Sequence, residues 1–294
     1  MMLRTLLSGL ICLGYVACAG AETESTEAVA ALTIADVQAA PDAWRTVDPE
    51  NMVIMDTSRG KIIIELLPEV APAHADQFRA YVRAGLYNGT AFHRVIKGFM
   101  AQGGDVEATH GADVMMEQMD GEFTFRRDPK VFAIDPVGPA DSATRGLHNG
   151  FPIETVAQFM SEMSFDGQVE TWMPHCKGVL STARTTDPNS ANAQFFLITD
   201  KGRHLDKEYT AKGRILSGMD AATKIKLGPS PDGAPIFNPD ILRTVVMAAD
   251  MPAAEQPKVY VQRTNSPEWT AVLIAADKSK TDVCDLPEIP VVIE

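Results

Sequence analysis

The chain has 294 residues, of which 45% are hydrophobic, a length that suits one large domain or two small ones. Its formal net charge is −13. Nucleic acids and anionic membrane surfaces bind proteins through basic patches, so the acidic charge argues against both as partners and favours solubility instead.

The first 21 residues are typical of a secretory signal peptide. A basic residue, Arg4, precedes an apolar run from Leu6 to Ala19, which is too short to span a bilayer as a helix. The run ends in Ala19-Gly20-Ala21, an A-x-A-type cleavage motif. We therefore expect an exported protein, periplasmic in a bacterial envelope, with no stable membrane span. A buried first helix and a lipoprotein anchored through Cys18 are the alternatives.

Export bears on the four cysteines of the chain. Cys12 and Cys18 would be removed with the signal peptide, which leaves Cys176 and Cys284. Two cysteines in an oxidising compartment can form one disulfide, and we expect these two to pair. Two separate thiols are the alternative, because sequence alone does not establish that the residues are close together.

Residues 22–50 are polar and Ala-rich, and we interpret them as a tether. After them, short β-rich runs alternate with turns. They predict strands over 52–57, 61–67, 178–183, 195–199, 213–218 and 241–249. Apolar residues at helical spacing predict one helix that begins near Pro72 and ends before Gly85, and a shorter one over 219–227. Many short strands with two helices indicate a mostly β fold.

Two runs carry the functional signal. Residues 87–105 (YNGTAFHRVIKGFMAQGGD) place Arg94, a permanently charged donor with a rigid fork of N–H groups, among aromatic and apolar neighbours. Residues 177–199 (KGVLSTARTTDPNSANAQFFLIT) combine a strand, a polar loop and Gln-Phe-Phe. In this order the two runs resemble the signatures of the cyclophilins, the cyclosporin-binding class of peptidyl-prolyl cis-trans isomerases. The resemblance covers residues 51–250.

The resemblance implies a closed antiparallel eight-stranded β-barrel capped by two helices. Relative to the family, residues 106–174 are a long insertion. A structureless loop of that length is uncommon in a compact domain, so we expect a partly ordered excursion beside the active-site groove, with a helical pattern over 151–163. Residues 251–294 form a C-terminal extension outside the resemblance, in which residues 270–275 resemble a strand.

The reaction of this family needs no nucleophile, and we expect neither a metal nor a cofactor. An X–Pro bond rotates slowly because twisting breaks amide resonance, which sets a barrier of ~18–20 kcal/mol. A catalyst must favour the twisted state over both planar states. In that state the proline nitrogen regains a lone pair, and the resemblance implies that Arg94 donates a hydrogen bond to it.

The resemblance implies further substrate-binding residues around Arg94. Gln102 matches the residue that holds the substrate carbonyl. Residues matching the apolar slot for the proline ring are Phe99, Met100, Phe196 and Leu205. Residues matching the groove for the positions before proline are Ala183, the backbone of Arg184, and Gln194. Phe92 and His93 lie next to the arginine, and we expect them to support it. The alternatives are that Phe92 is simply a core residue and that His93 is a hydrogen-bonded structural histidine.

The chain departs from the family at several groove positions. Arg184 stands where asparagine is usual, and the polar loop has one extra residue before Pro188. His204 stands where many members have tryptophan, so we expect weak cyclosporin binding. Tyr209 replaces a histidine and keeps a planar polar ring.

The sequence therefore predicts an isomerase that accelerates X–Pro rotation in exported proteins, with proline-containing unfolded or flexible polypeptides as partners. The alternative is a proline-segment-binding chaperone or holdase with little turnover. A hydrolase is excluded, because no nucleophile lies in a recognisable site context.

Overall fold

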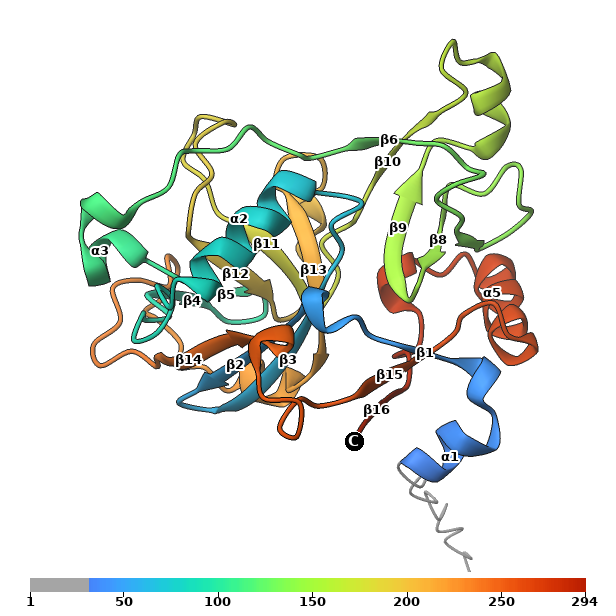
Figure 1. The fold of residues 1–294 in the computed structure, drawn as a ribbon. Helices are drawn as coiled ribbons and strands as arrows, with labels where there is room; N and C mark the ends of the chain where they lie inside the picture. Colours follow the sequence, from blue (N-terminus) through green and yellow to red (C-terminus); the bar gives the residue numbers. More distant parts are fainter. Residues whose placement is uncertain (1–31) are drawn as a thin grey trace, which may run out of the picture. The chain divides into compact units, whose positions relative to one another are not determined.

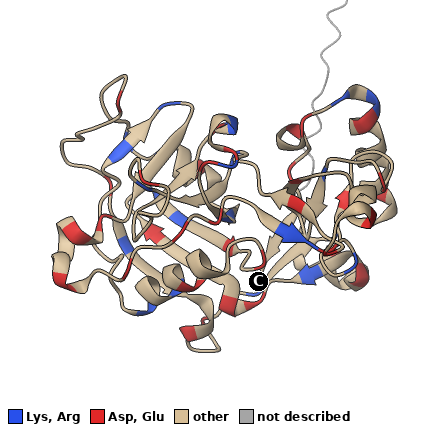
Figure 2. Ribbon diagram, turned by 90° about the horizontal axis from the view of Figure 1, so that it is seen from above, with Lys and Arg blue, Asp and Glu red and all other residues tan. Residues whose placement is uncertain are grey.

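The computed structural model describes residues 32–294. The predicted signal peptide, with Cys12 and Cys18, and the first part of the predicted tether lie outside the described residues. The described part is mostly β, with three antiparallel sheets and few helices. Figure 2 shows acidic and basic residues interspersed along its ribbon. In residues 32–294, no helix combines the length and apolar character that a membrane crossing requires.

Eight strands form the largest sheet, in the order β14-β2-β3-β13-β11-β12-β5-β4 (Figure 1). Their bounds are β2 Met52–Thr57, β3 Gly60–Leu66, β4 Arg94–Ile96, β5 Met100–Gly103, β11 Val179–Thr182, β12 Phe195–Ile198, β13 Ala211–Ser217 and β14 Leu242–Met247. Every neighbouring pair is antiparallel. All the predicted strands of this sheet occur, and their observed ends differ from the predicted ones by at most two residues.

The sheet curls into a half-barrel that stays open, so the expectation of a closed barrel is wrong. Its edge strands, β4 and β14, share no ladder. The segments just before them meet at an isolated bridge between Ala91 and Ile241, flanked by backbone hydrogen bonds between residues 89–92 and 240–242. The outer edge of β4 is taken instead by a loop: Val95 N donates to Gly233 O at 2.9 Å, and Gly228 N donates to Val95 O at 3.0 Å. A three-residue strand whose outer edge is already bonded cannot extend pairing to β14.

Two helices pack on the core of the half-barrel, as expected. Helix α2 (Pro72–Arg83) begins with a proline, which fits the first helical turn, and buries Ala75, Phe78, Tyr81 and Val82 on one face. Helix α4 (Met219–Thr223) is shorter than predicted and buries its two alanines in the same core.

A charged side chain lies inside the barrel without a counter-ion. Lys212 on β13 is 1% exposed, forms no ion pair among the described residues, and donates from Nζ to Thr182 Oγ1 at 2.8 Å. Its Nζ lies 4.3 Å from the centre of the Phe78 ring, a cation–π contact. Burial lowers the pKa of Lys212 from 10.5 to about 7.

The same hydroxyl continues into a chain of hydrogen bonds. His74 Nε2 lies 2.9 Å from the Asp120 carbonyl, to which it must donate, so His74 Nδ1 accepts from Thr182 Oγ1, also at 2.9 Å. Burial, followed by the charge of Lys212, lowers the pKa of His74 to about 4. These hydrogen bonds, from Lys212 through Thr182 and His74 to Asp120, thus link β13, β11 and α2 to the insertion.

The insertion forms a second antiparallel sheet, in the order β6-β10-β9-β8-β7 (Figure 1). Its elements are α3 Val106–His110, β6 Phe125–Arg127, β7 Asp135–Pro136, β8 Arg145–His148, β9 Phe151–Thr155, the 3₁₀ segment Gln158–Met163 and β10 Val169–Trp172. The helical pattern predicted over 151–163 is wrong for its first part, which is strand β9, whereas Gln158–Met163 is helical as a 3₁₀ segment. Phe151, Ile153 and Thr155 are buried in strict alternation, and Asn149-Gly150, with φ of 50° and 84°, forms the tight turn of a hairpin.

The N-terminal and C-terminal segments form a third sheet together, so residues 32–50 are not the simple tether that was expected. Its strands are β1 Trp44–Thr46, β15 Val259–Gln262 and β16 Val291–Ile293, in the order β1-β15-β16, preceded by helix α1 Ile34–Ala39. Buried Val259 and Val261 share an apolar cluster with Ile54 and Ile63, so this sheet packs on the β2–β3 hairpin.

The strand predicted over 270–275 is also wrong, because these residues lie within helix α5 (Pro267–Ser279). Ser266 caps the helix by accepting a hydrogen bond from Trp269 N at 3.3 Å, and Pro267 occupies its first turn. Its buried side chains share one apolar cluster with the insertion sheet and with Met100 and Phe196 of the half-barrel.

Cys176 and Cys284 form a disulfide, with their Cα atoms 4.9 Å apart, as predicted. The bond fastens the segment before β11 to the tail after α5.

Replacing Lys212 with methionine is expected to stabilise the protein by ~2–4 kcal/mol at pH 7, since it removes an uncompensated buried charge and keeps the apolar contact with Phe78. The folded pKa lies below the unfolded one, so the wild type loses stability as the pH falls from about 10.5 to about 7. The gain should therefore shrink as the pH is raised from 7 towards 10. Urea unfolding at several pH values measures it, with exposed Lys224→Met as the control. A pH-independent gain would contradict this account.

Breaking the disulfide is expected to destabilise the protein by up to ~4–5 kcal/mol. The bond closes a loop of 108 positions and so restricts the unfolded chain. Urea unfolding of the wild type with and without reductant, beside Cys284→Ser, measures this. The reductant should leave the variant unchanged. Thiol titration of unfolded, unreduced protein checks the bond directly, and two free thiols from Cys176 and Cys284 would rule it out.

Candidate active site

A hollow of about 260 Å³ opens on the half-barrel where β4, β5 and β12 face residues 203–209. Ten predicted substrate-site residues line it: Arg94, Phe99, Met100, Gln102, Ala183, Arg184, Phe196, His204, Leu205 and Tyr209. They come from two segments, residues 94–102 and 183–209, which lie far apart in the chain and are brought together by the fold. Gln194 lies beside this set, and Phe92 and His93 do not line the hollow.

Strand register places the central three residues in one row. Arg94 on β4 is paired with Gln102 on β5, which in turn is paired with Phe196 on β12. Directly opposed residues in antiparallel strands project to the same face of the sheet. Phe195, the next residue, is opposed to Gly103 and belongs to the core. Phe196 therefore faces the hollow and Phe195 does not, as the resemblance implied.

The Arg94 guanidinium is held from two sides. Its Nε donates to the carbonyl of Asp232 at 3.0 Å, and its Nη1 donates to Gln102 Oε1 at 3.2 Å. Gln102 Nε2 donates onward to Gln194 Oε1 at 2.9 Å. The remaining nitrogen, Nη2, has no hydrogen-bond partner among the described residues and is not enclosed, so it is available to a ligand.

The floor of the hollow is apolar. Met100 and Phe196 are almost fully buried, at 2% and 4% exposure. The Phe196 ring meets Tyr209 edge to face, with centroids 5.8 Å apart, and the Phe99 ring lies 4.9 Å from that of His204. An aliphatic ring of proline size would find apolar contacts here, with the guanidinium at the edge.

Two departures from the family pattern contact each other. The Arg184 guanidinium lies 4.4 Å from the centre of the Tyr209 ring, and 5.5 Å from that of Phe123 in the insertion. Its Nε donates to the Glu208 carbonyl at 3.0 Å. The arginine side chain therefore stacks against one wall of the hollow, and the insertion supports that wall.

The segment that carries His204 and Leu205 is anchored by residues that the sequence did not single out. Asp206 Oδ1 accepts from His175 N at 2.7 Å and contacts His175 Nδ1 at 3.0 Å. Burial lowers the pKa of His175, and Asp206 partly offsets this. Arg203 pairs with Asp206 at 2.9 Å and with Glu154 of the insertion at 2.6 Å. Only the Arg203–Asp206 pair has a local spacing, i to i+3, and the contacts with His175 and Glu154 have no signal in the sequence.

A second hollow of about 240 Å³ continues the groove beyond Gln102. Gln102, Ala183 and Arg184 line both hollows, and Gln194 lines the second. The insertion contributes one wall, with Val106, Glu107, Met115 and Gln118. The insertion therefore lies beside the groove.

The supporting residues have distinct positions. Phe92 is fully buried and meets Phe195 edge to face at 6.3 Å, which is a core role. His93 is half-buried, and its Nδ1 is enclosed without a hydrogen-bond partner among the described residues. Gly104 has φ of +76°, and a Cβ there would lie 2.8 Å from Phe195, so the turn after β5 requires glycine.

The hollow offers hydrogen-bond donors and apolar contact. Within residues 32–294, no three His, Cys, Asp or Glu side chains gather as metal ligands would. Its chemistry is that of a binding groove with two anchored guanidinium groups, Arg94 and Arg184.

Comparison with known proteins agrees with the fold and the groove. Residues 52–246 match the family described as "Cyclophilin type peptidyl-prolyl cis-trans isomerase/CLD". Since this match spans well over half of the chain, the protein belongs to the cyclophilin-type peptidyl-prolyl cis-trans isomerases.

Individual relatives extend this match. A "Probable peptidyl-prolyl cis-trans isomerase" of Brucella suis biovar 1 (strain 1330) is 38% identical over 223 residues, covering 76% of this chain and 93% of the relative. A "Peptidyl-prolyl cis-trans isomerase" of Acinetobacter baylyi is 32% identical over 185 residues, covering 61% and 74%. The crystal structure of the cyclophilin AquaCyp293 from Hirschia baltica is similar with a TM-score of 0.83 and 46% identity, covering 90% of this chain and 98% of that one.

Proposed function

We propose that this cyclophilin accelerates rotation about X–Pro bonds in exported polypeptides, with Arg94 as the hydrogen-bond donor to the twisted bond. One observation carries the proposal: Arg94, Gln102 and Phe196 form a single row across three strands, with the arginine fork at the edge of an apolar floor. This arrangement binds a proline ring and presents a donor to its nitrogen.

The proposed step makes and breaks no covalent bond. The proline ring lies on Phe196, Met100 and Leu205, and the twisting bond lies beside Arg94. In the planar states the imide nitrogen is a poor acceptor, whereas in the twisted state its lone pair accepts from Arg94 Nη2. That hydrogen bond is made only in the transition state, so it lowers the barrier instead of merely tightening binding.

Anchoring of Arg94 matters for the size of the effect. The Asp232 carbonyl and Gln102 already hold two of its nitrogens, so little reorganisation is needed as the bond twists. Gln102 Nε2 uses one N–H for Gln194 and keeps a second for a substrate carbonyl. The residues before proline would then occupy the second hollow, beside Ala183 and Gln194.

We also propose that the protein acts outside the cytoplasm, on proline-containing unfolded or flexible polypeptides of a bacterial periplasm. The signal-like residues 1–21 support this, and so does the Cys176–Cys284 bond, because disulfides persist in oxidising compartments. Cell fractionation with N-terminal sequencing tests it. A mature chain that begins at Glu22 in the periplasmic fraction is expected. An uncleaved chain in the cytoplasm would contradict export. A mature chain that begins at a lipidated Cys18 would show a membrane-anchored lipoprotein instead of a soluble periplasmic protein.

Arg94→Ala is expected to lower kcat/KM for isomerisation of a proline tetrapeptide by ~10²–10³-fold, the usual loss when one transition-state donor is removed. Peptide binding should fall much less. A protease-coupled assay measures turnover, and calorimetry measures binding. Arg243→Ala, at an exposed arginine on β14, is the matched control and should keep full activity.

If Arg94→Ala kept more than about half of the wild-type kcat/KM, the proposed role of the arginine would be wrong. If the wild type bound proline peptides without accelerating rotation, the protein would be the holdase that the sequence left open.

Cyclosporin is expected to inhibit the wild type weakly. His204 is exposed and packs its small ring on Phe99, so it lacks the wide apolar face and N–H of the indole that many relatives have there. His204→Trp should tighten inhibition by about tenfold. Exposed His110→Trp on α3 is the control and should change nothing. A nanomolar inhibition constant for the wild type would refute this expectation.

A further inference from the structure

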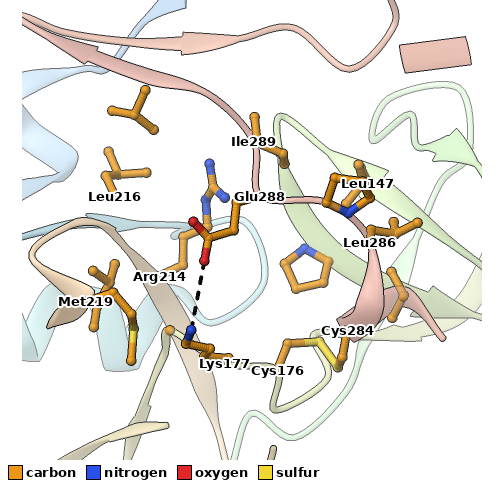
Figure 3. A pocket seen from close by; sticks show the side chains of 17 residues that line it. Leu147, Cys176, Lys177, Arg214, Leu216, Met219, Cys284, Leu286, Glu288 and Ile289 are labelled. Atoms are coloured by element: carbon orange, nitrogen blue, oxygen red, sulfur yellow. Dashed lines mark ion pairs between the residues drawn. A yellow bond between two sulfur atoms is a disulfide. The ribbon is translucent and has the colours of Figure 1, made fainter. Parts of the chain in front are cut away.

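A separate hollow of about 290 Å³ lies where the half-barrel meets the tail and the β8–β9 hairpin (Figure 3). It shares no lining residue with the candidate active site. One wall is the Cys176–Cys284 disulfide, and the tail after Cys284 forms another (Figure 3). The hollow therefore exists only because the insertion and the tail are folded onto the barrel.

Most of the residues that line it have apolar side chains, while polar atoms share the exposed surface about equally. Aliphatic and thioether side chains come from β8, β13, α4 and the tail: Leu147, Ile215, Leu216, Met219, Leu286 and Ile289. Charged groups lie at its rim, where Lys177 and Glu288 pair loosely at 3.9 Å, with both side chains largely exposed (Figure 3). The body of a ligand that fits here would be a hydrocarbon.

One charged group belongs to the wall itself. Arg214 on β13 is half-buried and lines the hollow (Figure 3). Its Nε and Nη2 are enclosed and make no hydrogen bond, while Nη1 is not enclosed. No ion pair of the described residues involves Arg214, and its guanidinium carbon lies 5.3 Å from the centre of the Phe151 ring. A guanidinium has five N–H donors, so this one is unusually poor in partners.

The neighbouring carboxylate, Glu65, is already paired with another arginine, Arg45. Glu65 lies opposite Arg214 in the β3–β13 register, yet its two oxygens accept from Nη1 and Nη2 of Arg45, at 2.5 and 2.7 Å. The three side chains therefore carry two positive charges and one negative charge. Burial lowers the pKa of Arg214 to about 10, which Glu65 counteracts and Arg45 reinforces. The cluster of Arg45, Glu65 and Arg214 therefore has one positive charge without a matching negative charge.

We propose that this hollow binds a small apolar monocarboxylate, with its head group at Arg214 and its hydrocarbon body against the aliphatic walls. A carboxylate accepts a charge-assisted hydrogen bond from the open Nη1 of Arg214 and supplies the missing negative charge. The same chemistry is carried by a free medium-chain fatty acid and by the C-terminal residue of a polypeptide that ends in leucine. The site is independent of the isomerase reaction.

Octanoate is the first probe, with octanol as its uncharged match and an N-acetylated dipeptide ending in free leucine as the second carboxylate source. Calorimetry on the full mature protein should give one octanoate site per chain, with octanol binding weaker by about tenfold or more. Arg214→Met should weaken octanoate binding by a similar factor, whereas Arg94→Ala should leave it unchanged. Whichever carboxylate binds more tightly identifies the source.

Met219→Trp provides a second test that keeps Arg214, because the larger ring fills the hollow and should abolish octanoate binding. It covers the case in which Arg214→Met does not fold. The proposal is overturned if neither carboxylate binds at millimolar concentration, if octanol binds as well as octanoate, or if octanoate binding survives in every correctly folded variant at positions 214 and 219.

Discussion

The position of β5 between β4 and β12 is the constraint on which the candidate active site depends. Because side chains alternate along a strand, a slip of one residue would turn Gln102 into the core and leave Arg94 opposite an apolar residue. The register is held from the other face, where Phe195 opposes Gly103 and packs with Phe92 and Tyr87. Aromatic packing in the core thus determines where the Arg94 guanidinium lies.

The rim of the groove depends on a different set of forces. His204 and Leu205 lie on a short 3₁₀ segment that could not hold its position alone. Arg203 connects this segment to the insertion through Glu154 and to the tail through Asp282, and Asp206 accepts hydrogen bonds from His175. Ion pairs that are partly shielded from solvent orient the segment more than they stabilise the fold.

The sequence predicted the barrel strands, the two capping helices and the ten residues that line the hollow, because short-range pattern and motif order carry that information. It did not predict that the sheet stays open, since the bonds from Val95 to Gly228 and Gly233 join residues far apart in sequence. The β8–β9 hairpin was missed although Asn149-Gly150 is a strong local turn signal. Helix α5 was missed although Ser266 and Pro267 mark its beginning. The contacts of His175 with Asp206 and of Arg203 with Glu154 join residues far apart in sequence and had no local signal.

The shared apolar cluster makes the insertion an integral part of the molecule. Phe151 and Ile153 of the insertion, Trp269 of α5, and Met100 and Phe196 of the groove are buried together. Excising residues 106–174 to obtain a minimal cyclophilin would uncover the underside of the proline slot and open a hydrophobic surface to water. Such a trimmed protein would keep every motif residue of the groove and would nevertheless aggregate through this exposed surface. In this chain, domain minimisation and preservation of the groove are therefore incompatible aims.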